Sequence, residues 1–312
     1  MPEGHSVRRL AEAFEAGFAG QRLEVASPQG RFADGAALLD GGVLEVCDAW
    51  GKHLFLGVRP EGGGELRWLH VHLGLYGAWT FAGDTAFAGP HAIGAPRVRV
   101  GEEERPLRGD AAADAAEAVG VAADPGDWTP PEPRGQVRVR IVGEHGVADL
   151  TGPTRCEVLT APARDAVVAR LGPDPLRPDP GGEGEARFVA DVRRRRTGIG
   201  VLLMDQAVLA GVGNIYRAEL LYRARVHPLR EGRSVAARTL QGIWRDAVVL
   251  MADGVATGRI VTTEAADRAA PSDAFYVYHR DGRPCLRCGT RVQVDDLAGR
   301  RVYWCPRCQR RR

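Results

Sequence analysis

Short hydrophobic runs interrupted by glycine characterise the first half of the chain. Val, Leu, Phe and Trp are dense in Gly42–Arg59 and in Glu65–Trp79, and these runs break at Gly51 and at residues 62–64. A further stretch, Gln136–Leu150, alternates apolar with basic residues. Such runs predict β-strands, because a strand exposes successive side chains on opposite faces and ends at turn-forming residues.

The hydrophobic period becomes helical in the second half of the chain and at the edges of the first half. Apolar residues recur every three or four positions, as a helix requires, in six segments: Val7–Ala16, Ala163–Leu171, Phe188–Arg195, Ile199–Ala207, Ile215–Ala224 and Val235–Ala256. The last forty residues return to short β segments around four cysteines. The pattern therefore predicts an α+β protein of several domains.

The changes of pattern place the domain boundaries. We predict a mainly β domain over residues 1–171, a proline-rich interdomain linker over 172–184, a helical domain over 185–268 and a cysteine-containing domain over 269–312. A chain of 312 residues is long enough for each main domain to bury its own core. Residues 101–135 are acidic and rich in Ala and Pro, which predicts a mobile surface insertion.

Composition and charge exclude few functions. No run approaches the ~20 apolar residues of a membrane span, and Met1–Ser6 lacks the apolar core of a secretory signal. We therefore expect a cytoplasmic protein with no membrane partner. The net charge of +2 does not by itself indicate a polyanion partner. Arg193–Arg196, and Arg307 with residues 310–312, are local clusters that suit either a polyanion-binding face or an ordinary solvated surface.

Lysine and asparagine each occur once, at Lys52 and Asn214. Arginine supplies surface charge, but it does not replace a compact ammonium that can lose its proton. Both residues are candidates for specialised roles, the alternative being chance survival of compositional drift. Asn214 ends the glycine turn 210–214, directly before a predicted helix. Free amides at that helix start, with the asparagine side chain, would form a phosphate seat, unless the turn is only a connection.

Four cysteines near the C-terminus have the spacing of a structural zinc ribbon. Cys285 and Cys288 form one CxxC pair, Cys305 and Cys308 form another, and sixteen residues separate the pairs. Disulfides are the alternative, but a cytoplasmic chain keeps its thiols reduced. We therefore predict one structural Zn²⁺.

The remaining cysteines and two strand histidines have no such partners in the sequence. Cys47 and Cys156 lie in apolar or strand contexts, which favour inert core thiols. His70 and His72 share one face of a predicted strand. Without a third ligand nearby, a structural role is favoured over metal binding.

Four blocks together resemble the formamidopyrimidine-DNA glycosylase and endonuclease VIII family. They are Met1-Pro2-Glu3-Gly4, Lys52 in its hairpin, Leu203–Asn214 and the four-cysteine ribbon, in family order and over nearly the whole chain. The resemblance implies an N-terminal β-sandwich with flanking helices, a helix-two-turns-helix DNA-binding domain and a C-terminal zinc finger. Damaged DNA, double- or single-stranded, is the implied partner of a monomeric, nucleoid-associated enzyme.

The resemblance also implies catalytic roles. Removal of Met1 would leave Pro2 with a free secondary amine that attacks C1′ of a damaged nucleoside, and the resulting imine would allow β- and δ-elimination. Such an amine is partly unprotonated at neutral pH. Glu3 is similar to the family residue that protonates the sugar ring oxygen and shuttles protons. Lys52 matches the hairpin lysine that assists the attack.

DNA contacts follow from the same comparison. Asn214 and Arg300, which stands five residues before Cys305, match the pair that holds the phosphates beside the flipped nucleotide. Leu75 and Tyr76 match the loop that fills the space left by that nucleotide. A Leu-Tyr pair resembles endonuclease VIII, whereas formamidopyrimidine enzymes usually carry methionine there.

Three departures from the family, and one short segment, distinguish this sequence; Ser6 affects a helper role of the usual carboxylate, and the others favour oxidised pyrimidines. Ser6 stands where glutamate is usual, and Gly74 stands where endonuclease VIII usually has glutamine. The Arg-Phe-Gly wedge of formamidopyrimidine enzymes is missing, and residues 151–155 occupy that region instead. The segment Thr263–Val277 is short for a loop that covers an oxidised purine.

The function implied is a bifunctional DNA glycosylase and AP lyase of base excision repair that acts on oxidised pyrimidines. Two alternatives stay open. One is a formamidopyrimidine-type enzyme for oxidised purines, and the other is a catalytically weak protein that binds damaged DNA.

Overall fold

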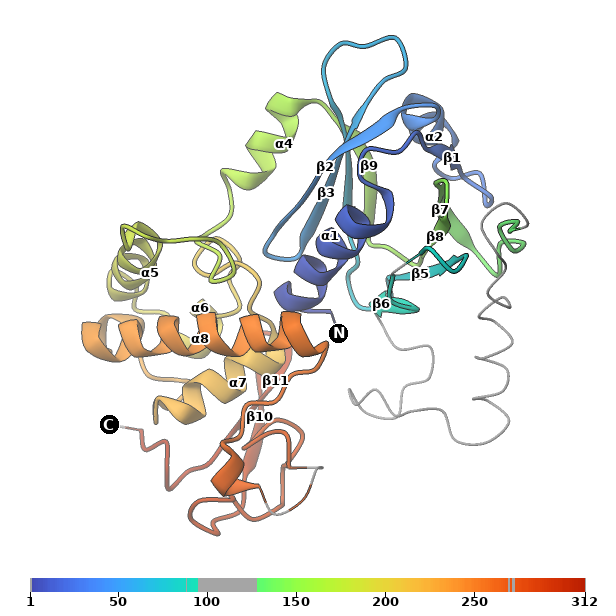
Figure 1. Ribbon diagram of the computed structural model, residues 1–312. Helices are drawn as coiled ribbons and strands as arrows, with labels where there is room; N and C mark the ends of the chain where they lie inside the picture. The colour runs from blue at the N-terminus through green and yellow to red at the C-terminus, as the bar shows by residue number, and fades with distance from the viewer. Residues whose placement is uncertain (1, 88, 95–127, 269, 271–272, 312) are drawn as a thin grey trace. The chain divides into compact units, whose positions relative to one another are not determined.

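A computed structural model describes residues 2–87, 89–94, 128–268, 270 and 273–311 (Figure 1). Residues 101–127 of the predicted insertion lie outside this described part. The chain divides into two compact units. One contains Pro2 and Ser6–Val168, and the other contains Glu3–His5 and Ala169–Arg312.

Two antiparallel sheets form the first unit. The four-stranded sheet has the order β2(Val43–Trp50), β3(His53–Arg59), β4(Arg67–His72) and β9(Arg155–Leu159). The five-stranded sheet has the order β1(Glu24–Ala26), β7(Val137–Val142), β8(Gly146–Thr151), β5(Ala78–Gly83) and β6(Ala92–Gly94). Their apolar faces share one core, which gives the β-sandwich that the sequence resemblance implied.

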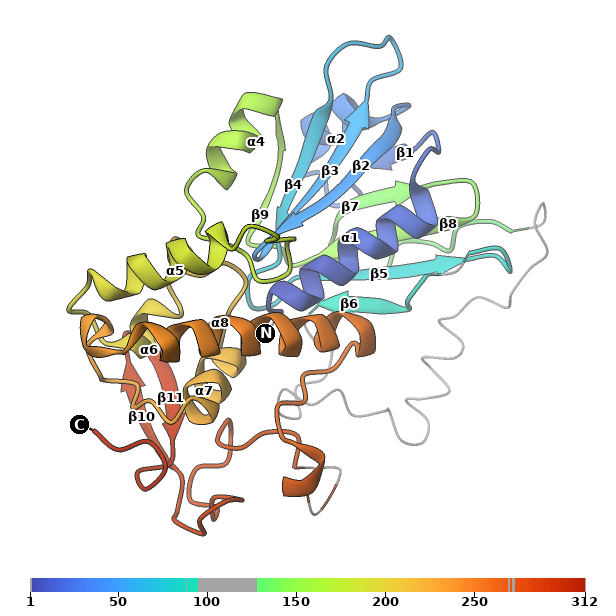
Figure 2. The ribbon, with the colours of Figure 1, turned by 60° about the vertical axis from the view of Figure 1, so that its left-hand side comes forward.

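Among the described residues, the helices that accompany the sandwich are α1(Gly4–Phe18), α2(Ala33–Leu39) and α4(Ala161–Val168). Helix α1 lies beside strands β5 and β8 in both ribbon views (Figures 1 and 2). Its Phe14 ring meets Trp79 of β5 edge to face, with the ring centroids 4.8 Å apart. This contact anchors the helix whose first turn carries the N-terminal residues of the candidate site.

The second unit consists of helices followed by a two-stranded ribbon. Its helices are α5(Glu183–Arg193), α6(Ile199–Leu202), α7(Asn214–Arg223) and α8(Ala237–Thr257), with short 3-10 turns at Gly232–Ser234 and Ala265–Asp267. Strands β10(Gln293–Leu297) and β11(Arg300–Trp304) pair antiparallel. The predicted α+β class, with helical domain and cysteine ribbon, is confirmed.

Several boundaries differ from the sequence predictions. The predicted strand Glu65–Trp79 is interrupted by a loop over residues 73–77, and the predicted helix Ile199–Ala207 ends at Leu202. Asp205 starts the next turn, because its carboxylate accepts the Ala207 N–H. Strands β1, β6 and β9 and helix α2 were not predicted, since each has seven residues or fewer and carries little periodic signal.

The proline-rich segment belongs to the second unit and packs within it. Residues 171–175 are buried. The Gly172 N–H donates to the Gln206 carbonyl, and the Ala210 N–H donates to the Pro173 carbonyl. These bonds fix the start of the segment that was predicted as a linker, and α5 begins at Glu183 within it. No helix in the described residues is long and apolar enough to cross a membrane.

Candidate active site and zinc centre

The carboxylate of Glu3 is bound by backbone amides at the start of α7. One oxygen accepts the Gly213 N–H at 2.7 Å and the Tyr216 N–H at 3.4 Å, and the other accepts the Ile215 N–H at 2.8 Å. Glu3 is fully buried. The first amides of a helix have no partner within the helix and carry a partial positive charge. The negative charge of Glu3 is therefore neutralised and its orientation fixed.

Glycines make the close approach possible. A Cβ on Gly213 would lie 2.5 Å from the Glu3 Cδ, and a Cβ on Gly4 would lie 2.8 Å from the Gly211 Cα. The Gly4 N–H donates to the Gly211 carbonyl at 2.8 Å. Gly211 also has a φ of 88°, which side chains rarely adopt. The glycine turn is therefore shaped to receive the N-terminal segment.

This arrangement corrects one sequence prediction. The amides at the start of α7 were predicted to form a phosphate seat with Asn214. The amides of Gly213, Ile215 and Tyr216 instead bind Glu3, so the prediction was wrong for these groups. The motif was correctly seen as an anion site, but its anion comes from the chain itself.

Asn214 is joined to the ribbon through Arg217, a residue that the sequence predictions missed. The Arg217 guanidinium donates to the Asn214 side-chain oxygen and, at 2.6 Å, to the Arg301 carbonyl on β11. Burial, opposed by the charge of Glu3 and assisted by that of Arg300, lowers the pKa of Arg217 to about 10. The structure thus brings Asn214 and Arg300 to the same buried guanidinium. The spacing of three residues from Asn214 to Arg217, one helical turn, was the available signal.

Lys52 occupies a two-residue hairpin turn between β2 and β3. Trp50 pairs with His53 across the turn. Gly51 has a φ of 59° at the first turn position, which a type II′ hairpin requires. Burial lowers the pKa of His53 to about 3 and that of His72 to about 4, and the Lys52 charge adds to both shifts. Lys52 therefore stands beside neutral imidazoles.

The strand histidines form a hydrogen-bonded row. His53 Nδ1 and His70 Nε2 lie 2.8 Å apart, and His70 Nδ1 lies 3.0 Å from a Glu157 carboxylate oxygen. A carboxylate only accepts, so His70 donates from Nδ1 and accepts from His53 at Nε2. The row ties the Lys52 hairpin to β4 and β9.

Leu75 and Tyr76 lie in the loop between β4 and β5. Tyr76 is 67% exposed, and the Gly77 N–H closes the loop on the Leu73 carbonyl at 3.0 Å. Gly74 has a φ of 66°, and a Cβ there would lie 1.6 Å from the Thr154 hydroxyl oxygen. Two departures from the family, at position 74 and in residues 151–155, are therefore in direct contact.

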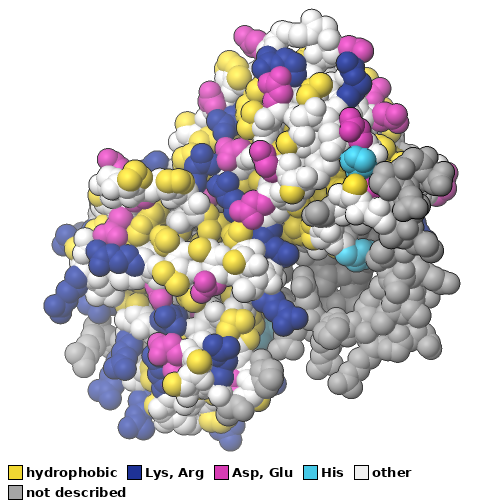
Figure 3. All heavy atoms as spheres, in the orientation of Figure 1, with side chains coloured by type: hydrophobic (Ala, Val, Ile, Leu, Met, Phe, Trp, Pro, Cys, Tyr) yellow, Lys and Arg dark blue, Asp and Glu magenta, His cyan; other side chains and the backbone are white. Residues whose placement is uncertain are grey.

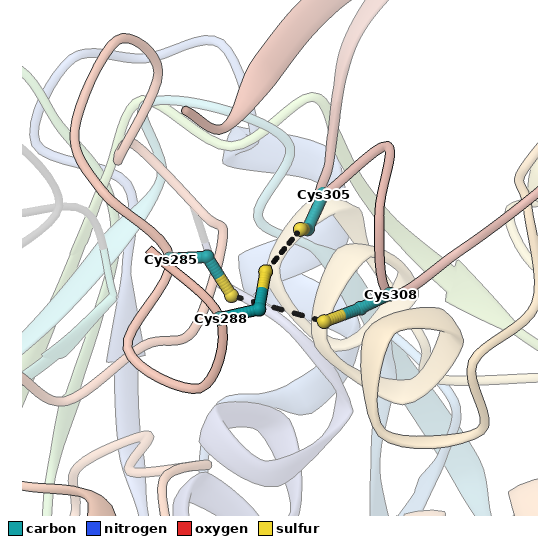
Figure 4. Close-up of side chains that lie close together, drawn as sticks. All are labelled: Cys285, Cys288, Cys305 and Cys308. Carbon is teal, nitrogen blue, oxygen red and sulfur yellow. Dashed lines mark hydrogen bonds between the residues drawn. The ribbon is translucent and has the colours of Figure 1, made fainter. Parts of the chain in front are cut away.

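Four cysteine sulfurs converge between the two knuckles of the ribbon (Figure 4). Cys285 Sγ lies 4.0 Å from Cys308 Sγ, and Cys288 Sγ lies 3.5 Å from Cys305 Sγ. Tetrahedral zinc with Zn–S bonds of ~2.3 Å needs sulfur separations of about 3.8 Å. The four thiols therefore fit one structural Zn²⁺, as predicted.

Helix α7 supports this centre from outside the sulfurs. The Tyr222 hydroxyl lies 3.1 Å from Cys285 Sγ. Glu219, fully buried, accepts the N–H groups of residues 276–278 and the Thr262 hydroxyl. Burial raises the pKa of Glu219, and these hydrogen bonds oppose the shift. Burial also raises the pKa of Cys47 and raises that of Cys156 to about 12, which makes both thiols unreactive.

Comparison with known proteins agrees with this geometry. Residues 171–265 match the formamidopyrimidine-DNA glycosylase H2TH domain, and residues 282–311 match the zinc finger found in FPG and IleRS. Endonuclease 8 1 of Mycobacterium tuberculosis (strain ATCC 25618 / H37Rv) is 42% identical over 315 residues, which cover 99% of the chain and 100% of that protein. The formamidopyrimidine-DNA glycosylase of Roseiflexus sp. (strain RS-1) is 37% identical over 160 residues, or 50% of the chain and 58% of that protein.

Solved structures show the same fold. The Lactococcus lactis Fpg in complex with DNA containing an abasic site superposes with a TM-score of 0.69 at 18% identity, over 99% of this chain and 100% of that one. The MutM (Fpg) protein of Thermus thermophilus superposes with a TM-score of 0.67 at 24% identity, over 99% of this chain and 98% of that one. With a relative 42% identical across almost the whole of both sequences, the chain belongs to the formamidopyrimidine-DNA glycosylase and endonuclease VIII family of DNA glycosylases.

Proposed function

We propose that this protein is a bifunctional DNA glycosylase and AP lyase of the endonuclease VIII type, which excises oxidised pyrimidines in base excision repair. The observation that carries the proposal is the fixed carboxylate of Glu3, held by three amides of the second unit directly after Pro2. A catalytic carboxylate must be oriented before the substrate arrives. These three hydrogen bonds, the tether of Glu3, also restrain the neighbouring nucleophile, Pro2.

The chemistry assigns a step to each residue. The secondary amine of Pro2, freed by removal of Met1, attacks C1′ and expels the base. An α-amino group has a pKa near 8, so part of it is nucleophilic at neutral pH. Glu3 passes protons to the sugar ring oxygen as the ring opens, and the imine then acidifies the C2′ hydrogens for β- and δ-elimination. Lys52 assists the attack.

Asn214 and Arg300 hold the DNA phosphates beside the lesion. Support comes from their shared neighbour Arg217, which bonds the Asn214 side chain and the Arg301 carbonyl. Phosphate contacts position DNA without reading its sequence, which suits an enzyme that must act wherever damage occurs. The partner is damaged DNA, double- or single-stranded, bound by a monomer in the cytoplasm at the nucleoid.

The lesion class is inferred from the β4–β5 loop. Exposed Tyr76, with Leu75, fills the space of the extruded nucleotide. The glutamine usual in endonuclease VIII does not fit at Gly74, because Thr154 occupies its place. The full-length similarity to proteins named Endonuclease 8 1 also favours this branch. An enzyme for oxidised purines and a catalytically weak damage-binding protein are the alternatives that the experiments below separate.

The nucleophile is tested by trapping. We expect intact mass measurement to show loss of Met1, and borohydride to link the protein to lesion-containing DNA through the peptide that begins with Pro2. Only an enzyme that forms an imine is trapped, so a damage-binding protein gives no adduct. An adduct mapped to Lys52 would remove the assignment of Pro2.

The tether of Glu3 is tested by Gly213→Ala. The new Cβ, 2.5 Å from the Glu3 Cδ, displaces the carboxylate, although Gly213 has a φ of −122° that alanine adopts freely. Acid–base catalysis contributes ~10²–10⁴-fold. We therefore expect excision under single-turnover conditions to slow by about 10²-fold, with zinc content unchanged.

The matched control for this variant is Gly242→Ala. Gly242 lies inside α8, where a Cβ meets no atom within 4 Å. This variant should keep full activity and gain slightly in stability, because alanine favours helix. Equal activity in the two variants would show that the tether is not needed for catalysis.

Zinc is expected to act through the ribbon that carries Arg300. Cys288→Ser should lose the metal, loosen the β10–β11 hairpin and weaken DNA binding at least tenfold, whereas Cys47→Ser should retain zinc. Metal content is measured by atomic absorption and binding by fluorescence anisotropy. Normal binding by the zinc-free variant would exclude the ribbon from the DNA contact.

Substrate preference is tested with a panel of lesions in duplex, bubble and single-stranded oligonucleotides. Thymine glycol or a dihydropyrimidine should be excised faster than 8-oxoguanine. The preference should grow in single strands, where little stacking must be replaced. Efficient removal of 8-oxoguanine opposite cytosine in duplex, with weak action on pyrimidine lesions, would favour the oxidised-purine alternative.

A further inference from the structure

An arginine-lined pocket lies in the second unit. It has a volume of about 550 Å³ and is lined by Arg225, Arg230, Arg287, Arg307 and Arg310. Two zinc-cluster cysteines complete its lining. Arg225 follows the C-terminal end of α7, whereas Asn214 begins that helix. At a rise of 1.5 Å per residue the two ends are separated by about 16 Å, so the pocket is distinct from the Asn214 phosphate contact.

Arg225 stands where helix geometry favours glycine. Its φ is 56°, its N–H donates to the Tyr222 carbonyl, and the Val226 N–H donates to the Leu221 carbonyl. These two bonds define a Schellman end, whose left-handed residue is usually glycine because a Cβ is unfavourable there. An arginine at this position stores strain, and strained residues gather at functional sites. The strain is consistent with a function for the side chain.

Most of the pocket charge has no acidic partner. Among the described residues, the side chains of Arg225, Arg307 and Arg310 make no ion pair, and the buried Nε of Arg230 has no hydrogen-bond acceptor. Arg287 differs, since it pairs with Glu264 and Asp267. A zinc ion with four thiolates carries a formal charge of about −2. Neutralising that charge does not account for a strained arginine or for a buried unpaired donor.

Backbone hydrogen bonds join the arginine quartet Arg193–Arg196, and the residues after it, to the segment that contains the pocket residue Arg230. The Arg233 N–H donates to the Arg195 carbonyl at 2.9 Å, and the Ile199 N–H donates to the Arg230 carbonyl at 2.8 Å. These bonds hold residues 193–199 against 230–233. Figure 3 shows Lys and Arg side chains gathered at the lower left, the region of α5, the ribbon and the C-terminus in Figure 1. We name the four pocket arginines that make no ion pair with the described residues the arginine track: Arg225, Arg230, Arg307 and Arg310.

We propose that the arginine track is a second nucleic-acid-binding surface, which binds the phosphates of a strand other than the one held at Asn214 and Arg300. Guanidinium groups bind phosphate oxygens through paired N–H donors. No aromatic ring lines the pocket, so it contacts the backbone and does not stack on bases. Four pocket arginines that make no ion pair with the described residues carry more charge than a single small anion needs, so they match the several phosphates of a strand better. A protein with two such surfaces transfers between DNA segments without full release.

The experiment saturates the site at Asn214 and Arg300 with one DNA and measures the binding of a second DNA to the arginine track. Full-length zinc-loaded protein is saturated with an unlabelled short duplex that contains a tetrahydrofuran abasic analogue. A fluorescent 20-nucleotide oligo-dT, which cannot pair with that duplex, is then titrated and followed by anisotropy. Wild-type protein should form a ternary complex. The variant with Arg225→Gly, Arg307→Ala and Arg310→Ala should bind oligo-dT at least tenfold more weakly, with a salt slope smaller by about 2, at ~0.7 per phosphate contact.

A matched control removes the same charge elsewhere. Arg31→Ala, Arg238→Ala and Arg259→Ala replace three exposed arginines outside the track, and this variant should form the ternary complex normally. Arg225→Gly alone should leave zinc content unchanged and leave the thermal midpoint unchanged or raised by about 2 °C, because glycine relieves the left-handed strain. Loss of zinc or of folding in this variant would give the arginine a structural role and overturn the proposal.

Other outcomes are equally decisive. Displacement of the tetrahydrofuran duplex by oligo-dT, without a ternary complex, would show one shared site. If oligo-dT did not bind and millimolar inorganic phosphate inhibited the enzyme, the pocket would be a site for a small anion. Failure of the protein to bind the tetrahydrofuran duplex would count against the proposed glycosylase function, whereas oligo-dT binding that depends on the track would still support this inference.

Discussion

The bond between the Glu3 carboxylate and the amides of α7 is the constraint on which the candidate active site depends. A residue near the chain start is otherwise among the least ordered parts of a protein. Three N–H donors and a buried setting remove that freedom. They also supply a partner for helix amides that would be unsatisfied inside the core. One interaction thus satisfies the helix amides and orients the candidate catalytic carboxylate, and its close approach explains why residue 213 is glycine.

The same helix organises the rest of the second unit through polar side chains that it buries. Asn214 and Arg217 lie at its start, Glu219 binds the backbone of residues 276–278, and Tyr222 reaches a zinc-cluster sulfur. Each of these groups is costly to bury unless it is bonded. Together they fix the ribbon, and with it Arg300, relative to Asn214. The relative position of Asn214 and Arg300 therefore depends on polar groups in the core that are satisfied by hydrogen bonds.

The sequence was most informative where a function needs consecutive or regularly spaced residues. The zinc cluster follows from four cysteines at fixed spacing, and the fold class follows from the change of hydrophobic period. The partner of Glu3 could not be predicted, since no local pattern links position 3 to position 213. Arg217 and Glu219 were missed because their value lies in contacts with β11 and with residues 276–278, which are distant in sequence. Short elements such as β9 were not predicted, because they contain too few residues to show a hydrophobic period.

Two departures from the family, at position 74 and in residues 151–155, lie in contact with each other and are best considered together. Gly74 replaces a usual glutamine, and Thr154 belongs to the segment that stands in place of the Arg-Phe-Gly wedge. Their contact means that a side chain at position 74 would collide with Thr154, and the positive φ of this position adds strain. The two changes therefore form one alteration of the loop. It leaves Tyr76 as the exposed large side chain of residues 73–77, so this loop presents chiefly one aromatic ring at its surface.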